Sequence, residues 1–156
     1  MDEQAQQITL SINGNAIVID AREHHNLGAF LRNEMSLTGT KAGCANGDCG
    51  ACNVLLDGAV SQSCQISLTA AAQCNVQTIE SIVRSELGKK ITDTLIKHDA
   101  AQCGYCLPGI VVAAYALLLE KNTSELEAGL QNNLCRCGSH RRILNALQEV
   151  AAVKDL

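Results

Sequence analysis

Residues 43–58 read GCANGDCGACNVLLDG, and this stretch decides the fold of the 156-residue chain. Cys44, Cys49 and Cys52 follow a C-x4-C-x2-C spacing, and Cys64 comes after them. The first three ligands of a plant-type [2Fe-2S] cluster have this spacing. The interleaved glycines suit a loop that wraps a cluster, because glycine tolerates unusual backbone angles and close approach. Four buried cysteines acting as small apolar side chains would not account for this pattern.

The sequence around this stretch predicts a small mixed sheet with one helix. Apolar residues alternate with polar ones before an Asn-Gly turn, which is typical of a hairpin. An asparagine precedes a short apolar-faced segment and can cap a helix there. The expected elements are strands at 8–12, 16–20, 53–56 and 60–64, turns at 13–15 and 57–58, and a helix that follows Asn26.

The second half of the sequence predicts helices. We expect a first helix over 91–100 and a second that begins at Pro108 and, being apolar on nearly every face, lies at the centre of a bundle. Ser124 and Glu127 form a capping-box pattern for a third helix, and Ser139 can cap a fourth. Between 82 and 90 we expect a linker, which divides the chain into domains 1–82 and 83–156.

Four more cysteines form a second group in the helical half. Cys103 and Cys106 make a C-x2-C pair, and Cys135 and Cys137 make a C-x-C pair. Each pair lies just before an expected helix start, where free N–H groups and partial positive charge suit a dianionic four-thiolate cluster. Taken alone, the C-x2-C pair also fits a thioredoxin-like dithiol or half of a zinc site.

Composition limits the class of protein. Hydrophobic residues make up 47% of the chain and aromatic ones 2%, so aliphatic side chains must form the core. Two domains of roughly 80 residues would be only marginally stable on apolar burial alone. The nine cysteines are the candidates for the additional stabilisation. The net charge of −4, without a basic run, excludes a nucleic-acid partner.

The compartment is expected to be the cytoplasm, with membrane association or export only through a partner. The longest apolar run, 110–119, is too short to span a bilayer. In a reducing compartment, many cysteines favour metal or redox chemistry over disulfides. Cys74 is left over and is expected to be a free thiol. Arg136, Arg141 and Arg142 are either a solvated helix end or a group that tunes a cluster or contacts an anionic partner.

The cysteine motifs together resemble one family. GCANGDCGACNVLLDG with a later SC, QCGYCLPG and NLCRCG are similar to the iron–sulfur subunit of the molybdenum hydroxylases, over about residues 7–152. The resemblance implies an α+β fold, in which a β-grasp plant-type ferredoxin domain precedes a four-helix [2Fe-2S]-binding domain. Each domain would hold one [2Fe-2S] cluster. The ligands would be Cys44, Cys49, Cys52 and Cys64 for the first cluster and Cys103, Cys106, Cys135 and Cys137 for the second.

The family also implies partners. By resemblance, Gln102 and Cys137 touch the pterin of a large molybdenum-cofactor subunit, whose cofactor would be molybdopterin cytosine dinucleotide. Electrons would pass from that subunit through the second and then the first cluster site to FAD or haem c in a further partner. The complex would hydroxylate an aromatic N-heterocycle or oxidise an aldehyde on the partner chain, since this chain supplies no catalytic acid, base or nucleophile.

One motif points to a subgroup of this family. The form CRCGSH at 135–140, where many family members have CRCTGY, is similar to the small subunits of isoquinoline 1-oxidoreductase and nicotinate dehydrogenase.

Two other interpretations remain at this point. A stand-alone ferredoxin-like carrier would have similar cysteine motifs without a permanent partner. A zinc-stapled interaction module would account for the second cysteine group but poorly for the first.

Overall fold

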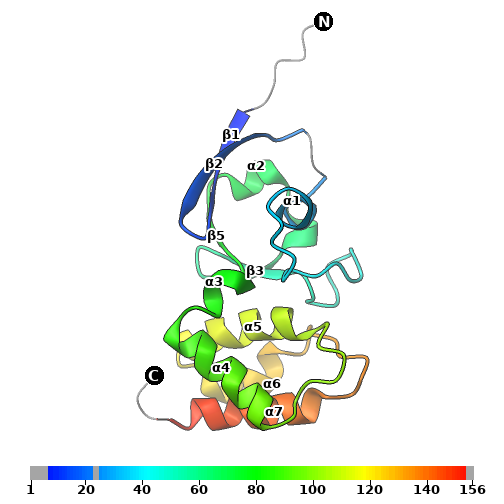
Figure 1. Ribbon diagram of the computed structural model, residues 1–156, viewed down its shortest axis with the longest axis vertical. Coiled ribbons are helices and arrows are strands. Elements are labelled where there is room, and N and C mark those ends of the chain that lie inside the picture. The colour runs from blue at the N-terminus through cyan, green and yellow to red at the C-terminus, as the bar shows by residue number, and fades with distance from the viewer. Residues whose placement is uncertain (1–6, 23–24, 154–156) are drawn as a thin grey trace, which may run out of the picture.

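A computed structural model describes residues 7–22 and 25–153 of the chain. Residues 1–6, 23, 24 and 154–156 of the two expected domains lie outside these ranges. A strand-rich half and a helical half lie end to end along the long axis (Figure 1). Among the described residues, no helix combines the length and apolar character that a membrane span requires.

The strand-rich half contains a mixed sheet in the order β2-β1-β5-β3-β4. Its strands are β1 (Gln7–Ile12), β2 (Asn15–Asp20), β3 (Asn53–Leu56), β4 (Ala59–Gln62) and β5 (Asn75–Gln77). Both predicted hairpins are confirmed, with Asn13 and Gly14 at positive φ in the first turn. The short strand β5 was not predicted. It pairs parallel to β1 and antiparallel to β3, and so joins the two hairpins into one sheet.

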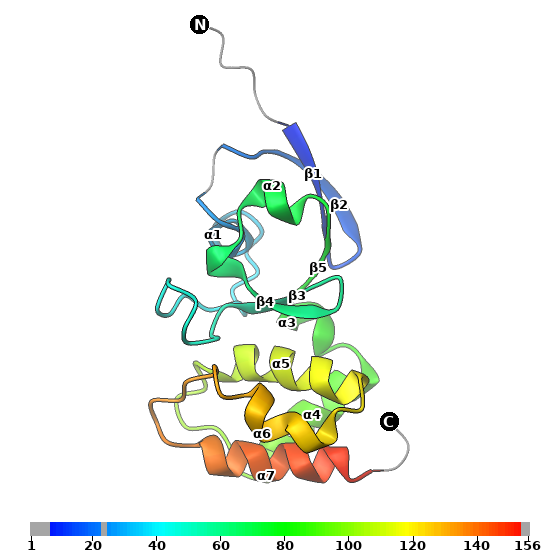
Figure 2. The same cartoon turned by 180° about the vertical axis from the view of Figure 1, so that it is seen from behind.

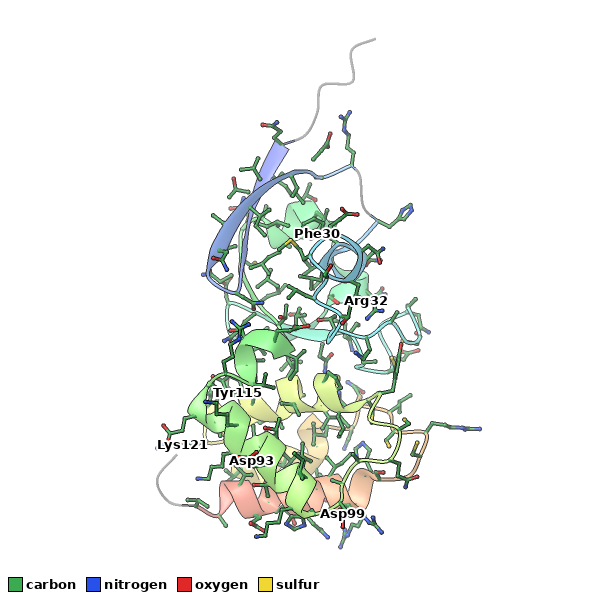
Figure 3. The ribbon with its side chains drawn as sticks, in the orientation of Figure 1. Phe30, Arg32, Asp93, Asp99, Tyr115 and Lys121 are labelled. Carbon is green, nitrogen blue, oxygen red and sulfur yellow. The ribbon has the colours of Figure 1, made fainter. Side chains whose placement is uncertain are left out.

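One face of the sheet is covered by α1 (Leu27–Asn33) and the short α2 (Leu68–Ala71) (Figure 2). Asn26 caps α1 as predicted, since its Oδ1 accepts a hydrogen bond from Ala29 N at 2.8 Å. Phe30, the one phenylalanine of the chain, points into this half (Figure 3). The fully buried side chains around it are aliphatic: Leu10, Ile12, Leu27, Leu31, Val54, Leu68 and Val76.

The helical half contains α3 (Ile79–Ile82), α4 (Glu86–Lys97), α5 (Leu107–Leu119), α6 (Leu126–Gly129) and α7 (His140–Ala151). As predicted, α5 begins with proline in its first turn and is buried along most of its length. It lies between the sheet and the other helices (Figures 1 and 2). The apolar core around α5 includes Leu55 of the sheet as well as Ile79 and Ile82, so the two halves share buried surface.

The expected linker at 82–90 is wrong in its second part. The helix expected over 91–100 begins at Glu86, because Ser85 Oγ caps it by accepting a hydrogen bond from Gly88 N at 3.0 Å. Gly88 is helical and packs against Ile82, where a Cβ atom would lie 1.9 Å from the carbonyl oxygen. The glycine therefore marks a close contact with α3 and not a flexible connection.

The caps expected in the last two helices differ from the structure. Ser124 lies within a 3-10 turn (Thr123–Glu125), and α6 starts after it without a side-chain cap. Ser139 does precede α7, as predicted, but its backbone is already helical, so its hydroxyl does not cap the helix. The third of the four expected helices, α6, is a single turn of 4 residues.

Candidate metal centres

The first cysteine loop runs from α1 to β3 and turns its amides toward its own sulfur atoms. Ala45, Gly47 and Gly50 have positive φ angles, which permits this path. Cys44 Sγ accepts hydrogen bonds from Asp48 N at 3.2 Å and Cys49 N at 3.3 Å. Amides, that of Asn46 foremost, lower the pKa of the Cys44 thiol to about 7. The loop thus stabilises negative charge on sulfur.

Cys52 and Cys64 complete the first group from the inner side. Cys52 is buried, and burial raises the pKa of its thiol to about 11, with the Cys64 side chain beside it adding to the effect. The 3-10 turn η1 (Ser63–Gln65) carries Cys64 across the loop, and Ser63 Oγ donates to Cys52 O at 2.8 Å. The four cysteines of this group thus range from the exposed Cys44 through Cys49 and Cys64 to the buried Cys52.

The second cysteine group forms where α5 and α7 begin. Cys103, Cys106, Cys135 and Cys137 all line one small cavity. Burial raises the pKa of the Cys106 thiol to about 12, and the Cys135 side chain acts in the same direction. The pKa of Cys103 is lowered by the Tyr105 amide and then by the Cys137 side chain. For Cys135, burial opposes ionisation, but amides led by that of Ser139 lower its pKa overall.

The two cysteine groups lie on the same side of the molecule and touch through their backbones. The loops that carry them project together from one long side (Figures 1 and 2). Leu134 N, next to Cys135, donates to Cys49 O at 3.0 Å. Tyr105 Oη, between Cys103 and Cys106, donates to Ala42 O at 2.5 Å. A single backbone hydrogen bond, from Leu134 to Cys49, thus connects the loops of the two centres.

Glycine allows the start of α5 to lie directly on the first cysteine loop. A Cβ atom at Gly109 would fall 2.0 Å from Gly50 O. Asn53 Nδ2 donates to Gly109 O at 3.3 Å, and Asn133 Nδ2 donates to Gly50 O at 3.4 Å. Sequence patterns do not indicate these contacts, because they depend on residues of neutral type that are far apart in the chain.

The two residues expected to contact a pterin, Gln102 and Cys137, are hydrogen-bonded to each other. Gln102 Nε2 donates to Cys137 O at 3.1 Å, and the Gln102 side chain is exposed. Cys74, by contrast, lies at the start of β5, away from both groups. Its pKa is raised, chiefly by the Asp57 carboxylate that accepts from the thiol.

The donor set suits iron–sulfur clusters. Four cysteines are neighbours in each centre, and four thiolates are what a [2Fe-2S] cluster takes from a protein. In the first centre the thiols occur as two pairs, Cys44 with Cys49 and Cys52 with Cys64, each pair linked through its side chains. No three such side chains in the described ranges converge on a single ion, so the assignment rests on these pairs and on the motifs.

Comparison with known protein families gives two matches that together span most of the chain. A 2Fe-2S iron-sulfur cluster binding domain matches residues 10–87, and a [2Fe-2S] binding domain matches residues 78–148. One of the nicotinate dehydrogenase subunits from Pseudomonas putida is 38% identical over 150 residues, covering 94% of this chain and 96% of its own. The chain belongs to the iron–sulfur subunits of the molybdenum hydroxylases.

Solved structures agree with this membership. Quinoline 2-oxidoreductase from Pseudomonas putida contains a chain with a TM-score of 0.84 and 35% identity, over 96% of this chain and 95% of its own. The aldehyde oxidoreductase of Desulfovibrio desulfuricans matches with a TM-score of 0.83 and 34% identity over 94% of this chain, but over only 17% of its own longer chain.

The family confirms the α+β fold of a ferredoxin-type domain followed by a helical [2Fe-2S]-binding domain. It also confirms that this molybdenum hydroxylase subunit transfers electrons as part of an oxidoreductase complex. The stand-alone carrier is the weaker interpretation, because the relatives are subunits of larger enzymes.

Proposed function

We propose that the chain holds one [2Fe-2S] cluster in each cysteine group and passes electrons between them. Cys44, Cys49, Cys52 and Cys64 would bind the first cluster, and Cys103, Cys106, Cys135 and Cys137 the second. When bound, the clusters supply one-electron carriers. The observation that carries the proposal is the gathering of all eight predicted cysteines into two groups of four whose backbones touch. We also propose the domains 1–82 and 83–156, with α3 at the end of the first domain packed into the core of the second.

The second centre is proposed to face the molybdenum cofactor of a large partner subunit. Gln102 and Cys137 form an exposed, hydrogen-bonded edge beside this centre, which fits contact with a pterin. The cofactor itself is proposed to be molybdopterin cytosine dinucleotide. The backbone of Cys137 would be held in place by the Gln102 amide, so the two residues would meet the pterin as one unit.

An apolar groove next to this edge supports a permanent partner. The groove, about 440 Å³ in volume, lies between α4 and α5, and its lining includes Ala101 and Gly104 at the second cysteine loop. Ile96, on its rim, is 73% exposed. Apolar surface of this kind is typical of an interaction site. Arg136 and Arg141 are exposed near the same loop and would add attraction to an acidic partner surface.

The first centre is proposed as the exit for electrons. Its loop is exposed around Cys44, so a further acceptor, with FAD or haem c, could approach it. Fixed thiol positions and amides directed at sulfur set the potential of such a centre. Arg32, which donates to Thr38 O and Thr40 O, stiffens the segment that leads into the loop (Figure 3).

The complex is proposed to act on an aromatic N-heterocycle or an aldehyde in the cytoplasm. The relatives named for nicotinate and for quinoline support the first class, and the aldehyde oxidoreductase supports the second. Substrate chemistry would reside entirely on the partner chain.

Purification of the tagged chain from its own cells tests this proposal. We expect a large chain and molybdenum to copurify in a fixed ratio to iron, and nicotinate, quinoline or an aldehyde to bleach the visible absorption of the complex. Ile96→Glu should lower the molybdenum-to-iron ratio, whereas Val18→Glu, an equal change at a 64% exposed site on β2, should not. Full activity with no molybdenum-containing chain would contradict the proposal.

A further inference from the structure

Ser139 stands out because its hydroxyl is buried without a partner. The side chain is 4% exposed, and Ser139 Oγ makes no hydrogen bond to any other described residue. A buried hydroxyl in that state is costly, and native proteins rarely leave one so. A group bound beside Ser139 would satisfy this hydroxyl by accepting its hydrogen bond.

The position of Ser139 indicates what that group is. Ser139 lines the same small cavity as all four cysteines of the second centre. Its amide already contributes to lowering the pKa of Cys135, which places the residue at that sulfur. The nearby His140 ring donates through Nε2 to Asn133 O at 2.6 Å, and Ser139 Oγ makes no hydrogen bond to this ring.

We propose that Ser139 Oγ donates a hydrogen bond into the second centre, to a sulfur of the cluster that these cysteines hold, and so raises its reduction potential. This inference rests on the proposed ligand set. Reduction adds one electron and its negative charge to the centre without adding an atom. A hydroxyl directed at sulfur stabilises that charge, because hydrogen bonds to charged acceptors are the stronger ones.

The geometry also explains why Ser139 has a helical backbone instead of capping α7. An extended N-cap residue would turn its side chain toward the helix amides. With φ −77° and ψ −1°, Ser139 keeps its hydroxyl free of those amides. Gly138, at φ +80°, makes the turn that brings the chain from Cys137 to this position. Ser139 is thus a positioning and tuning residue.

Ser139→Ala tests the inference in the full chain carrying its clusters. A redox titration followed by low-temperature EPR should show the midpoint potential of the second cluster shifted to a more negative value, with that of the first unchanged. In D₂O, the alanine variant should show one exchangeable deuteron fewer coupled to the second cluster than the wild-type protein, because the backbone amides near Cys135 remain in both. Ser139→Thr, which keeps the hydroxyl, should restore both.

Thr40→Val is the matched control. Thr40 Oγ1 is the other buried hydroxyl without a partner among the described residues, and Thr40 does not line the cavity. This variant should leave the second potential unchanged. An unchanged potential in Ser139→Ala, or an equal shift in Thr40→Val, would overturn the inference. Absence of a second EPR signal from the wild-type protein would instead overturn the proposed ligand set.

Discussion

Gly109→Ala should separate α5 from the first cysteine loop. The added Cβ atom would lie 2.0 Å from Gly50 O, whereas real Cβ atoms essentially never approach closer than 3.0 Å. The neighbour is backbone within the loop between Cys49 and Cys52 and cannot rotate away. The helix or the loop must therefore move by about 1 Å or more.

The size of the effect follows from three contributions. Overpacking of this kind costs about 1–3 kcal/mol. The hydrogen bonds from Asn53 to Gly109 O and from Asn133 to Gly50 O would be strained or lost, at about 1 kcal/mol each. Alanine gains about 1 kcal/mol over glycine as a helix residue. The net destabilisation is about 2–4 kcal/mol, or roughly 5–15 °C in the thermal midpoint.

Gly129→Ala provides the control for this variant. Its Cβ would meet the end of the flexible Leu117 side chain at 2.6 Å, which can rotate away. Thermal unfolding of the cluster-loaded proteins, followed by circular dichroism and visible absorption at one scan rate, compares the two. Gly109→Ala should unfold earlier and alter the magnetic interaction between the clusters. Equal midpoints for the two variants would refute the close contact between helix and loop.

Four other variants test separate parts of the account. Cys49→Ser and Cys106→Ser should each lose about two of four iron atoms and destabilise one half, since metal binding and folding are coupled; a variant that kept all its iron would disprove that ligand. Tyr105→Phe should cost about 1 kcal/mol of stability by removing the bond to Ala42 O, and an unchanged thermal midpoint would argue against that bond. Glu149→Gln should flatten the stability profile in acid. Lys97, and after it His98, hold the pKa of Glu149 below its ordinary 4.5, so these ion pairs stabilise the fold above pH 4.5 and lose that effect as the pH falls through the lowered pKa. A wild-type excess in stability that did not shrink as the pH fell below 4.5 would contradict this pairing.

The grouping of the cysteines could be predicted from the sequence, because the short spacing within each motif already places them close together. Cys44, Cys49 and Cys52 lie within one loop, and each pair of the second group precedes a helix. Asn26 and Pro108 were equally local signals, and both act as predicted at the starts of α1 and α5. Short-range geometry was enough for these features.

Features that depend on distant contacts were missed. The strand β5 has only three residues, and its pairing with β1 and β3 comes from their position and not from its own composition. Gly88 looked like part of a linker because the sequence does not show the close packing on Ile82 that requires it. The hydrogen bond from Leu134 N to Cys49 O involves only backbone atoms, so the residue types in the sequence do not predict it.

The most direct test of the account is the metal content of the purified chain. Iron and acid-labile sulfide are measured together, and low-temperature EPR is recorded after reduction with dithionite. The account predicts about four iron and four sulfide per chain and two distinguishable rhombic signals. Zinc without sulfide, or about two iron with a single signal, would contradict a cluster in each cysteine group.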